Sequence, residues 1–370
     1  MTTRDDSKLL KQISDRAQEI RTDGYSMSIG EVLSLYRDGD IEIHPEFQRI
    51  FRWDDDQKSK LIESILLGIP IPPIFVSQRA DGVWDVIDGV QRISTILQFV
   101  GDYVNEDGEK IGHLKLRAAE YLTHLEGYTY VKSNSDTLGP VFNEAMRRDF
   151  KRAKLEFRII TKESDSNAKY DLFQRLNSGS ILSPQEARNC LMVMINKPFY
   201  TQIISLSQSE DFLACVPLTD RQQDQAYRDE LILRFYCQSE FTGGTTELHK
   251  EYGEYITDWM RKAASRGSEI DAELFKDTFK LLNSALGEDT FRRMGRNGHA
   301  GPFSISGYEF VTSGVSYNLA LWSTKSSTEL RNRIESIWAT PEFKSNSGTG
   351  VSPRRRVPRL INASRDYFGE

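Results

Sequence analysis

The N-terminal half of the chain alternates between two hydrophobic periods. Apolar residues recur at the i, i+3, i+4 and i+7 spacing of an amphipathic helix in two segments, at residues 29–36 and 93–100, and an apolar stripe at residues 61–66 predicts a third helix. Short runs typical of strands lie between and after them, at residues 41–43, 74–76, 83–87 and 154–160. Residues 1–24 are polar and predict a helical lead-in.

Capping residues define where the predicted helices begin and end. Capping-box patterns occur at three positions, Ser28 with Glu31, Asp54 with Gln57 and Ser183 with Glu186. Gly39 and Gly68 are placed to end the first two helices. Residues 101–150 are weakly patterned, which indicates an insertion or a lid.

From residue 196 onward the pattern is almost wholly helical, with apolar spacing at residues 229–236, 252–260 and 272–282. Together the two halves predict an α+β fold, in which a small mixed sheet with helices precedes a mainly α-helical domain. We expect domains at residues 1–195 and 196–370, the second with a basic C-terminal tail.

Composition narrows the class of protein. The chain has 370 residues, with 48 Lys+Arg, 54 Asp+Glu and a net charge of −6. No signal peptide and no apolar run long enough for a membrane span is visible, and the three cysteines are far apart. These features favour a cytoplasmic protein with reduced thiols, without a zinc site and without a membrane partner.

The sharpest candidate site is Asp88-Gly89-Val90-Gln91-Arg92, where a strand pattern changes to a helix pattern. A helix start offers free N–H groups and a positive dipole end to an anion. Arg92 could hold a phosphate, Gln91 could orient water, and Asp88 could position water or bind Mg²⁺. The alternative is an ordinary Asp-Gly turn with Asp88 as a helix cap and Arg92 exposed.

A second candidate site follows the first strand, at Gln48, Arg49 and Trp53. It repeats the pairing of an amide with a guanidinium, so both pairs could close on one anion. The alternative is a surface arginine and a tryptophan packed over the core.

The order of these motifs resembles the N-terminal domain of GmrSD-type restriction systems, which also opens SspE-like DNA-defence proteins. The resemblance rests on Pro45-x-Phe47-Gln48-Arg49-x-x-x-Trp53, Val86-Ile87-Asp88-Gly89-x-Gln91-Arg92-x-x-Thr95 and Phe173-x-x-Leu176-Asn177-x-Gly179-x-x-Leu182-Ser183-x-Gln185-Glu186-x-Arg188-Asn189. It weakens at Arg228-Asp229 and Arg234, where we expect an interior salt-bridged helix, and it covers about residues 28–240.

The resemblance implies a ParB/sulfiredoxin-like fold that binds a nucleoside triphosphate (NTP) of unspecified base and hydrolyses it in a DNA-defence system. It implies catalytic roles for Asp88, Gln91 and Arg92, with Asp88 as candidate Mg²⁺ ligand. The implied nucleotide-binding residues are Gln48, Arg49, Trp53, Gly89, Thr95, Asn177, Gln185 and Arg188. Asn177 could equally end a helix, and Gln185 could equally support a cap.

Two features depart from the family pattern. The family usually has glutamine where this chain has Val90. The family's C-terminal half carries a His-Asn metal-dependent nuclease, and no such constellation is visible here. Asn297-Gly298-His299 lies in a basic, glycine-rich stretch that we interpret as a phosphate-contacting loop or a surface turn.

Three stretches are basic and could contact a DNA backbone. Residues 147–158 have six basic residues against two acidic ones, residues 290–301 have three against none, and residues 351–370 have five against two. The candidate DNA-binding residues are Arg147, Arg148, Lys151, Arg152, Arg292, Arg293, Arg296, Arg354, Arg355 and Arg356. The alternative for each stretch is a solvated surface.

We therefore expect an NTPase component of a DNA-defence system. The alternatives are a DNA-binding sensor or nickase, and a regulatory subunit that acts on a separately encoded nuclease or methyltransferase. An oligomer is compatible with the sequence.

Overall fold

The computed structural model divides the chain into two compact units, Met1–Leu182 and Ser183–Glu370. It describes residues 4–17, 21–43, 53–104, 109–132, 139–162, 183–244, 247–267, 270–295, 298–347 and 351–370. The predicted boundary at 195/196 differs from this division, because the helix that begins at Pro184 packs within the second unit.

The first unit has a five-stranded sheet with the strand order β1-β5-β3-β4-β2. The strands are β1 (Thr22–Ser28), β2 (Ile41–Glu42), β3 (Ile74–Gln78), β4 (Trp84–Asp88) and β5 (Lys154–Ile160). β1 runs antiparallel to β5 and β3 antiparallel to β4, whereas β3/β5 and β2/β4 are parallel. The mixed sheet confirms the predicted α+β class.

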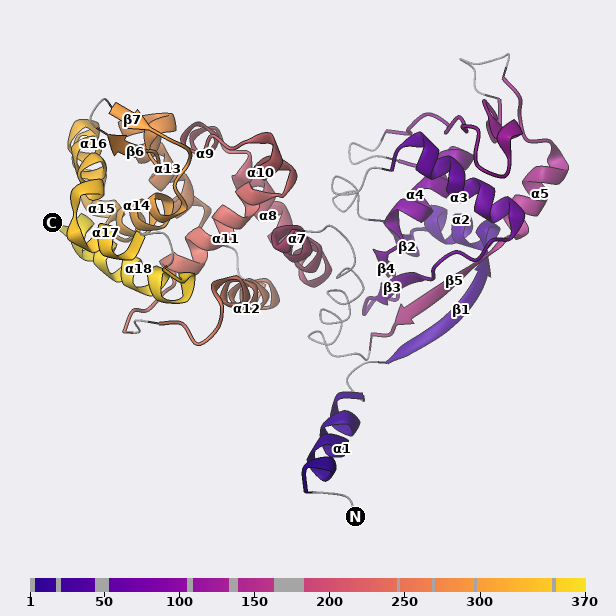
Figure 1. Ribbon diagram of the computed structural model, residues 1–370, viewed down its shortest axis with the longest axis horizontal. Helices are drawn as coiled ribbons and strands as arrows, with labels where there is room; N and C mark the ends of the chain where they lie inside the picture. Colours follow the sequence, from indigo (N-terminus) through magenta and orange to yellow (C-terminus); the bar gives the residue numbers. More distant parts are fainter. Residues whose placement is uncertain are drawn as a thin grey trace. The chain divides into compact units, whose positions relative to one another are not determined.

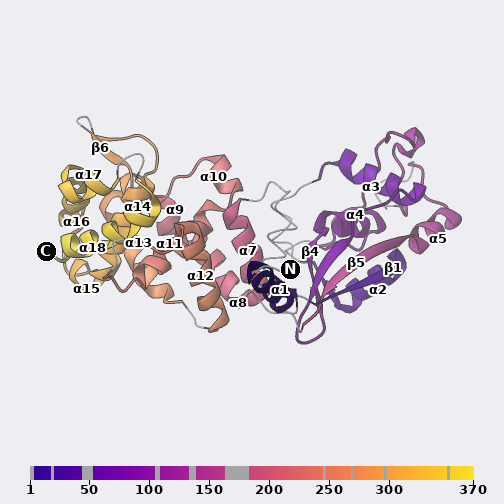
Figure 2. The same ribbon diagram turned by 60° about the horizontal axis from the view of Figure 1, so that its bottom comes forward.

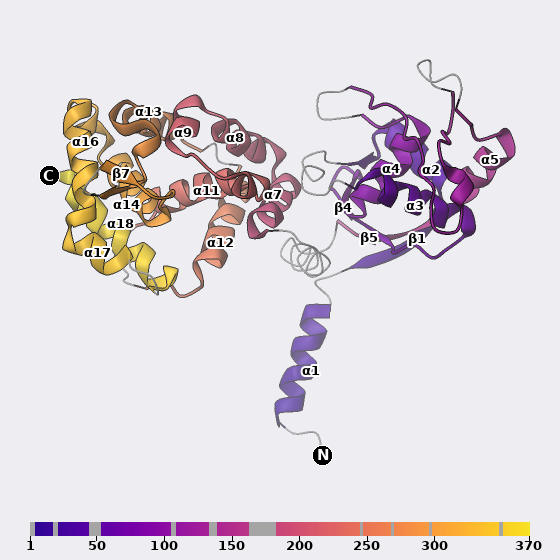
Figure 3. The same cartoon turned by 45° about the horizontal axis from the view of Figure 1, so that its top comes forward.

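Helices α2, α3 and α4 lie on one side of this sheet (Figures 1 and 3). The helical elements of the first unit are α1 (Arg4–Ala17), α2 (Ile29–Asp38), α3 (Asp55–Leu67), α4 (Val90–Val100), the 3-10 turn η2 (Thr123–Leu125) and α5 (Glu144–Arg152). The capping box predicted at Asp54 is confirmed, with both hydrogen bonds between Asp54 and Gln57 present. At Ser28 the structure contains the N-cap half of the box: the side chain accepts from the Glu31 N–H, while Glu31 Oε1 accepts from the Tyr25 hydroxyl.

Strand β1 is the main element that the sequence pattern did not predict. Its residues TDGYSMS lack a clear period-2 pattern, and residues 22–24 were assigned to the helical lead-in. Figure 2 shows β1 beside β5, with which it pairs from Thr22↔Ile160 to Ser28↔Lys154. Pairing with a segment far along the chain therefore decides the conformation of this strand.

Residues 101–150 have little regular structure, but the described part packs on the core. Buried Glu63 of α3 accepts hydrogen bonds from the N–H groups of Tyr121 (2.7 Å) and Leu122 (2.6 Å). Phe142 and Phe150 pack edge-to-face on Phe99, with ring centroids 5.1 and 5.4 Å away. These contacts anchor the segment, so they favour the predicted insertion over a lid.

Among its described residues, the second unit is helical apart from one short hairpin. Its elements are α7 (Pro184–Ile195), α8 (Lys197–Ser207), α9 (Glu210–Cys215), α10 (Asp220–Asp224), α11 (Tyr227–Ser239), α12 (Tyr252–Ser265), α13 (Ala272–Leu286), η3 (Gly287–Asp289), β6 (Arg293–Gly295), β7 (Gly298–Ala300), α14 (Ile305–Tyr317), α15 (Leu319–Trp322), α16 (Ser327–Ser336), η4 (Ile337–Ala339), α17 (Pro341–Ser347) and α18 (Pro353–Gly369). The predicted glycine-rich loop at 292–299 is thus partly a β-hairpin.

The basic segment at the C-terminal end, which was predicted as a tail, folds as helix α18. Its apolar residues are buried against α14 at helical spacing, namely Val357, Leu360, Ile361 and Phe368. The apolar spacing of this helix is present in the sequence between the arginines. The three cysteines are buried, and burial raises the pKa of the Cys215 thiol to about 12.

No helix among the described residues is long and apolar enough to cross a membrane.

We expect Gly314→Ala to destabilise the second unit by about 1–3 kcal/mol. A Cβ atom at this position in α14 would stand 2.2 Å from Cδ2 of Phe368 and 2.7 Å from the carbonyl oxygen of Ser364. The backbone carbonyl cannot rotate away, so α14 and α18 would have to separate. Thermal unfolding of the variant measures the change.

Gly30→Ala is the matched control, because it also adds a Cβ to a helical glycine. Its nearest neighbour would be the Lys151 carbonyl oxygen at 3.5 Å, which is ordinary contact. We expect this change to be neutral or stabilising, since alanine favours helix more than glycine does. Equal destabilisation by both changes would contradict the close packing of α14 on α18.

Candidate functional site

The first candidate site is the junction between β4 and α4. β4 ends at Asp88, and Gly89 follows as the N-cap of α4 with φ 95° and ψ 11°. A Cβ atom at residue 89 would lie 3.1 Å from Cγ1 of Ile74 and 3.2 Å from Nη2 of Arg92. Both the backbone conformation and the close neighbours therefore require glycine here.

The start of α4 has no side-chain cap and no acidic residue in its first turn. Asp88 therefore does not cap α4, in contrast to the alternative interpretation of the Asp-Gly turn. No capping side chain compensates the N–H groups of the first turn or the positive end of the helix dipole. This arrangement suits an anion.

Arg92 holds the junction together. Its Nη2 donates a 2.7 Å hydrogen bond to Oδ2 of Asp88, and its Nη1 donates to the carbonyl oxygens of Pro72 and Pro73. The Arg92 side chain is 11% exposed and that of Asp88 is 35% exposed. The guanidinium thus fixes the segment before β3 against α4, and it adds positive charge at the helix start.

The other residues predicted near this junction fall into three groups. Gln91 accepts a hydrogen bond from the Trp53 N–H at 3.3 Å, so these two lie together as expected. Thr95 is 2% exposed, which places its hydroxyl in the interior and away from a surface ligand. Gln48, Arg49 and Asn177 lie outside the described residues.

Metal-binding capacity at the junction rests on Asp88. Within the described part of the chain, no three His, Cys, Asp or Glu residues gather as a metal site. One carboxylate fits the way proteins hold Mg²⁺ with a phosphate substrate, where the phosphates and water supply the remaining oxygen ligands.

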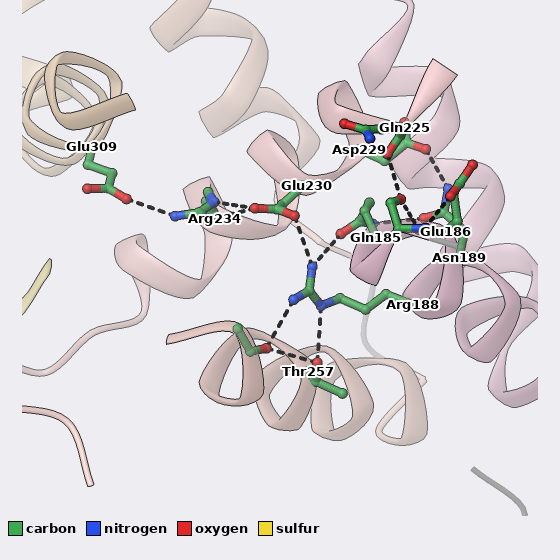
Figure 4. A network of polar contacts seen from close by, with 12 residues as sticks. Gln185, Glu186, Arg188, Asn189, Gln225, Asp229, Glu230, Arg234, Thr257 and Glu309 are labelled. Carbon is green, nitrogen blue, oxygen red and sulfur yellow. Dashed lines mark hydrogen bonds and ion pairs between the residues drawn. The ribbon is translucent and has the colours of Figure 1, made fainter. Parts of the chain in front are cut away.

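Gln185 and Arg188 lie on α7 in the second unit, where a buried polar network occupies them (Figure 4). The Arg188 guanidinium donates to Gln185 Oε1 (2.9 Å), Thr257 Oγ1 (3.1 Å), Glu230 Oε2 (3.1 Å) and the Gly253 carbonyl oxygen (3.2 Å). With its side chain only 5% exposed, Arg188 is a structural residue in this fold. These contacts favour a structural role over the predicted role in a nucleotide pocket.

Gln185 is held in the same buried polar network, which likewise favours a structural role. Its Nε2 donates to Asn189 Oδ1 at 2.8 Å, and Asn189 in turn donates to Asp229 at 2.6 Å. The side-chain amide of Gln185 thus links Arg188 to Asn189 inside the helical unit. It does not cap α7, since Ser183 and Glu186 form the predicted capping box.

The network continues as a chain of alternating charges from α11 to α18. Arg234 contacts Glu230 at 2.6 Å and Glu309 at 2.8 Å, and Arg356 donates to Glu309 at 3.1 Å. Burial alone would lower the pKa of Arg234, but Glu230 and Glu309 raise it above its ordinary value. The prediction of an interior salt-bridged helix at 229–234 is confirmed.

A family model for the N-terminal domain of GmrSD restriction endonuclease matches residues 29–193, which is less than half of the chain. Residues 29–193 are a GmrSD-type N-terminal domain. No match to the chain emerged among curated proteins or among solved structures.

The GmrSD-type domain does not coincide with one compact unit. It begins at α2 and ends within α7, whereas the units divide between Leu182 and Ser183. The last helix of the GmrSD-type domain therefore packs against α8, α11 and α12 of the second unit. The motif around Arg188 serves this packing.

The candidate DNA-binding residues outside the GmrSD-type domain are largely paired. Arg354 contacts Glu247 and Glu251, Arg355 contacts Glu247, and Arg356 is bound to buried Glu309. Arg292 contacts Asp289 at 3.0 Å. Arg293 is exposed on β6, and Arg296 lies outside the described residues. The pairing with buried Glu309 favours a structural role for Arg356 over the predicted DNA contact.

His299 also has a structural environment. Its two ring nitrogens lie 3.2 Å from the Arg292 carbonyl oxygen and 3.2 Å from Glu335 Oε1. These contacts join the β6–β7 hairpin to α16.

Two sets of charged side chains that stabilise the GmrSD-type domain were not predicted from the sequence. Arg79 binds Asp85 and Glu42, which ties the β3–β4 turn to β2. Glu63 holds the irregular segment after α4, as described above. The sequence signal for Glu63 was its position inside an apolar helical segment, because a carboxylate that is buried there requires hydrogen-bond partners.

Proposed function

We propose that the chain is an NTP-binding and NTP-hydrolysing component of a DNA-defence system. The GmrSD-type domain places the protein in a restriction or defence setting. The uncapped start of α4 beside Asp88, Gln91 and Arg92 is the observation that carries the nucleotide part of the proposal.

The first step is phosphate binding at the start of α4. Gly89 lets the backbone approach the ligand, and the first-turn N–H groups donate to phosphate oxygens. Arg92 stabilises this geometry by holding the Pro72–Pro73 carbonyls, while its charge offsets the negative charge of the phosphates. Gly89 and Arg92 are therefore assigned to binding and positioning.

Hydrolysis requires a positioned water and charge compensation. Gln91 can orient water through its amide, because its oxygen accepts a hydrogen bond from the Trp53 N–H and its NH₂ group is a donor suited to a ligand or water. Asp88 can accept a hydrogen bond from that water or hold a phosphate-bound Mg²⁺, which would neutralise developing charge. The partner proposed for the system as a whole is DNA.

The test is phosphate release from each of the four common NTPs, with and without unmodified and modified DNA. Turnover of one or more NTPs by the full chain supports the proposal. Binding of an NTP without turnover under every condition would favour a nucleotide-dependent DNA sensor. A complete lack of NTP binding would contradict the proposal.

A further inference from the structure

One surface of the first unit carries a concentrated excess of positive charge. It comprises residues from α5 and from the adjoining strand β5, and we name it the α5–β5 basic surface. Its basic residues are Arg147, Arg148, Lys151, Arg152, Lys154 and Arg158. All except the half-buried Arg147 are exposed, and the nearby acidic residues are Glu144, Asp149 and Glu156.

Few of these cations are neutralised within the described part of the chain. Arg148 pairs with Glu144 at 2.6 Å, but the two side chains are 65% and 71% exposed. Such an exposed pair is weak and can yield to a competing anion. Lys151, Arg152 and Lys154 form no ion pair within the described ranges. This contrasts with Arg354, Arg355 and Arg356, whose carboxylate partners lie in the same unit.

The surface is rigidly supported. Phe150 buries the inner face of α5 at 1% exposure, and the N–H of Ile29 donates to the Ala153 carbonyl oxygen at 2.8 Å. Leu155, Phe157 and Ile159 bury the inner face of β5. The cations therefore project from an ordered helix and strand, so they lose little conformational freedom of the backbone when they bind.

The shape of the surface suits an extended polyanion. Arg148 and Arg152 are one helical turn apart, about 6 Å between their Cβ atoms. The Arg158 guanidinium lies across Gly24 on β1, where a Cβ atom would stand only 2.9 Å from its Nη1. The cations thus continue from the helix onto the outer side of the sheet edge, where a line of phosphates can meet several of them.

We propose that the α5–β5 basic surface binds the phosphate backbone of duplex DNA. This inference rests on the proposed function for the choice of DNA among polyanions, but it does not require NTP binding or hydrolysis. Because the contacts are to phosphates, binding is expected to be largely independent of base sequence and to weaken steeply with salt.

The experiment measures the affinity of the full chain for a fluorescent DNA duplex without nucleotide, from about 50 to about 200 mM salt. We expect Arg148→Gln/Arg152→Gln to weaken binding about tenfold at the low-salt end and to reduce the log–log salt slope by about 2. The variant should retain the thermal unfolding of the unaltered chain, because both side chains are exposed.

Lys276→Gln/Lys280→Gln is the matched control. These two exposed lysines are also one turn apart on a helix, and Lys276 pairs with Glu273 at 3.1 Å. They differ because Glu273 and Asp277 balance their charge. Unchanged binding by this control, together with loss in the α5 variant, supports the assignment.

Three results would overturn the assignment. The first is unchanged DNA binding by the α5 variant, and the second is equal loss by the control. The third is equal or tighter binding of single-stranded RNA or anionic lipid vesicles by the unaltered chain. Phosphate release in the absence of DNA tests the NTPase proposal separately, on the unaltered chain and on the α5 variant. An absence of turnover in the unaltered chain would contradict the NTPase proposal and leave the DNA-binding proposal standing.

Discussion

Glu309→Gln is expected to destabilise the second unit by about 3–5 kcal/mol. The Glu309 side chain is fully buried on α14, and it accepts hydrogen bonds from Arg234 and Arg356. The amide removes the negative charge, so Arg356 loses the carboxylate that it contacts, and Arg234 keeps only Glu230, which it shares with Arg188. The cost arises because neither arginine can lose its proton or reach water without disrupting the helices.

Urea denaturation followed by circular dichroism measures this change, and the transition of the second unit should move to lower urea. Glu273→Gln is the control, since Glu273 forms a solvent-exposed pair with Lys276 and should matter little. Comparable effects of the two changes would contradict the role of Glu309 as a buried counter-ion. Arg356→Met should also destabilise the unit, because it leaves Glu309 with Arg234 alone.

Asp88→Asn is expected to lower the kcat of NTP hydrolysis about 100-fold or more while the KM changes little. Asparagine keeps the shape and can still accept a hydrogen bond from Arg92, but it cannot accept a proton or hold Mg²⁺ with a full charge. The measurement is steady-state phosphate release with the NTP that the unaltered chain prefers.

Arg92→Lys should instead raise the KM and lower the kcat, because lysine cannot bind Asp88 and the Pro72–Pro73 carbonyls together. Asp277→Asn, an exposed carboxylate on α13, is the control and should leave turnover unchanged. Full activity in Asp88→Asn would rule out the β4–α4 junction as the hydrolytic site. Loss in the control as well would point to a general effect on folding.

Local signals in the sequence predicted several helix starts and one strand–helix junction. The capping residues Ser28, Asp54 and Ser183 have short-range geometry, so their pattern alone places three helix starts. The change of hydrophobic period at Asp88-Gly89 likewise located the β4–α4 junction. The structure added that Gly89 is the cap and that Asp88 pairs with Arg92.

Long-range partners decided what local patterns could not. Strand β1 exists because residues 22–28 pair with β5, more than a hundred residues further along the chain. The roles of Arg188 and Arg356 depend on carboxylates from other helices, and a basic residue in a motif does not reveal whether it meets a ligand or a buried acid. Sequence spacing carries no information about such pairings.

The sequence alone predicted the mixed α+β class, the starts of α2, α3 and α7, and a resemblance to GmrSD-type domains that the family model confirms over residues 29–193. It also showed three basic stretches without distinguishing among them. The three-dimensional structure was needed to show that the arginines at 354–356 are paired with carboxylates, whereas Arg148, Lys151, Arg152 and Lys154 are exposed. The physical reason is that charge compensation is a property of neighbours in space, which the order of residues along the chain does not specify.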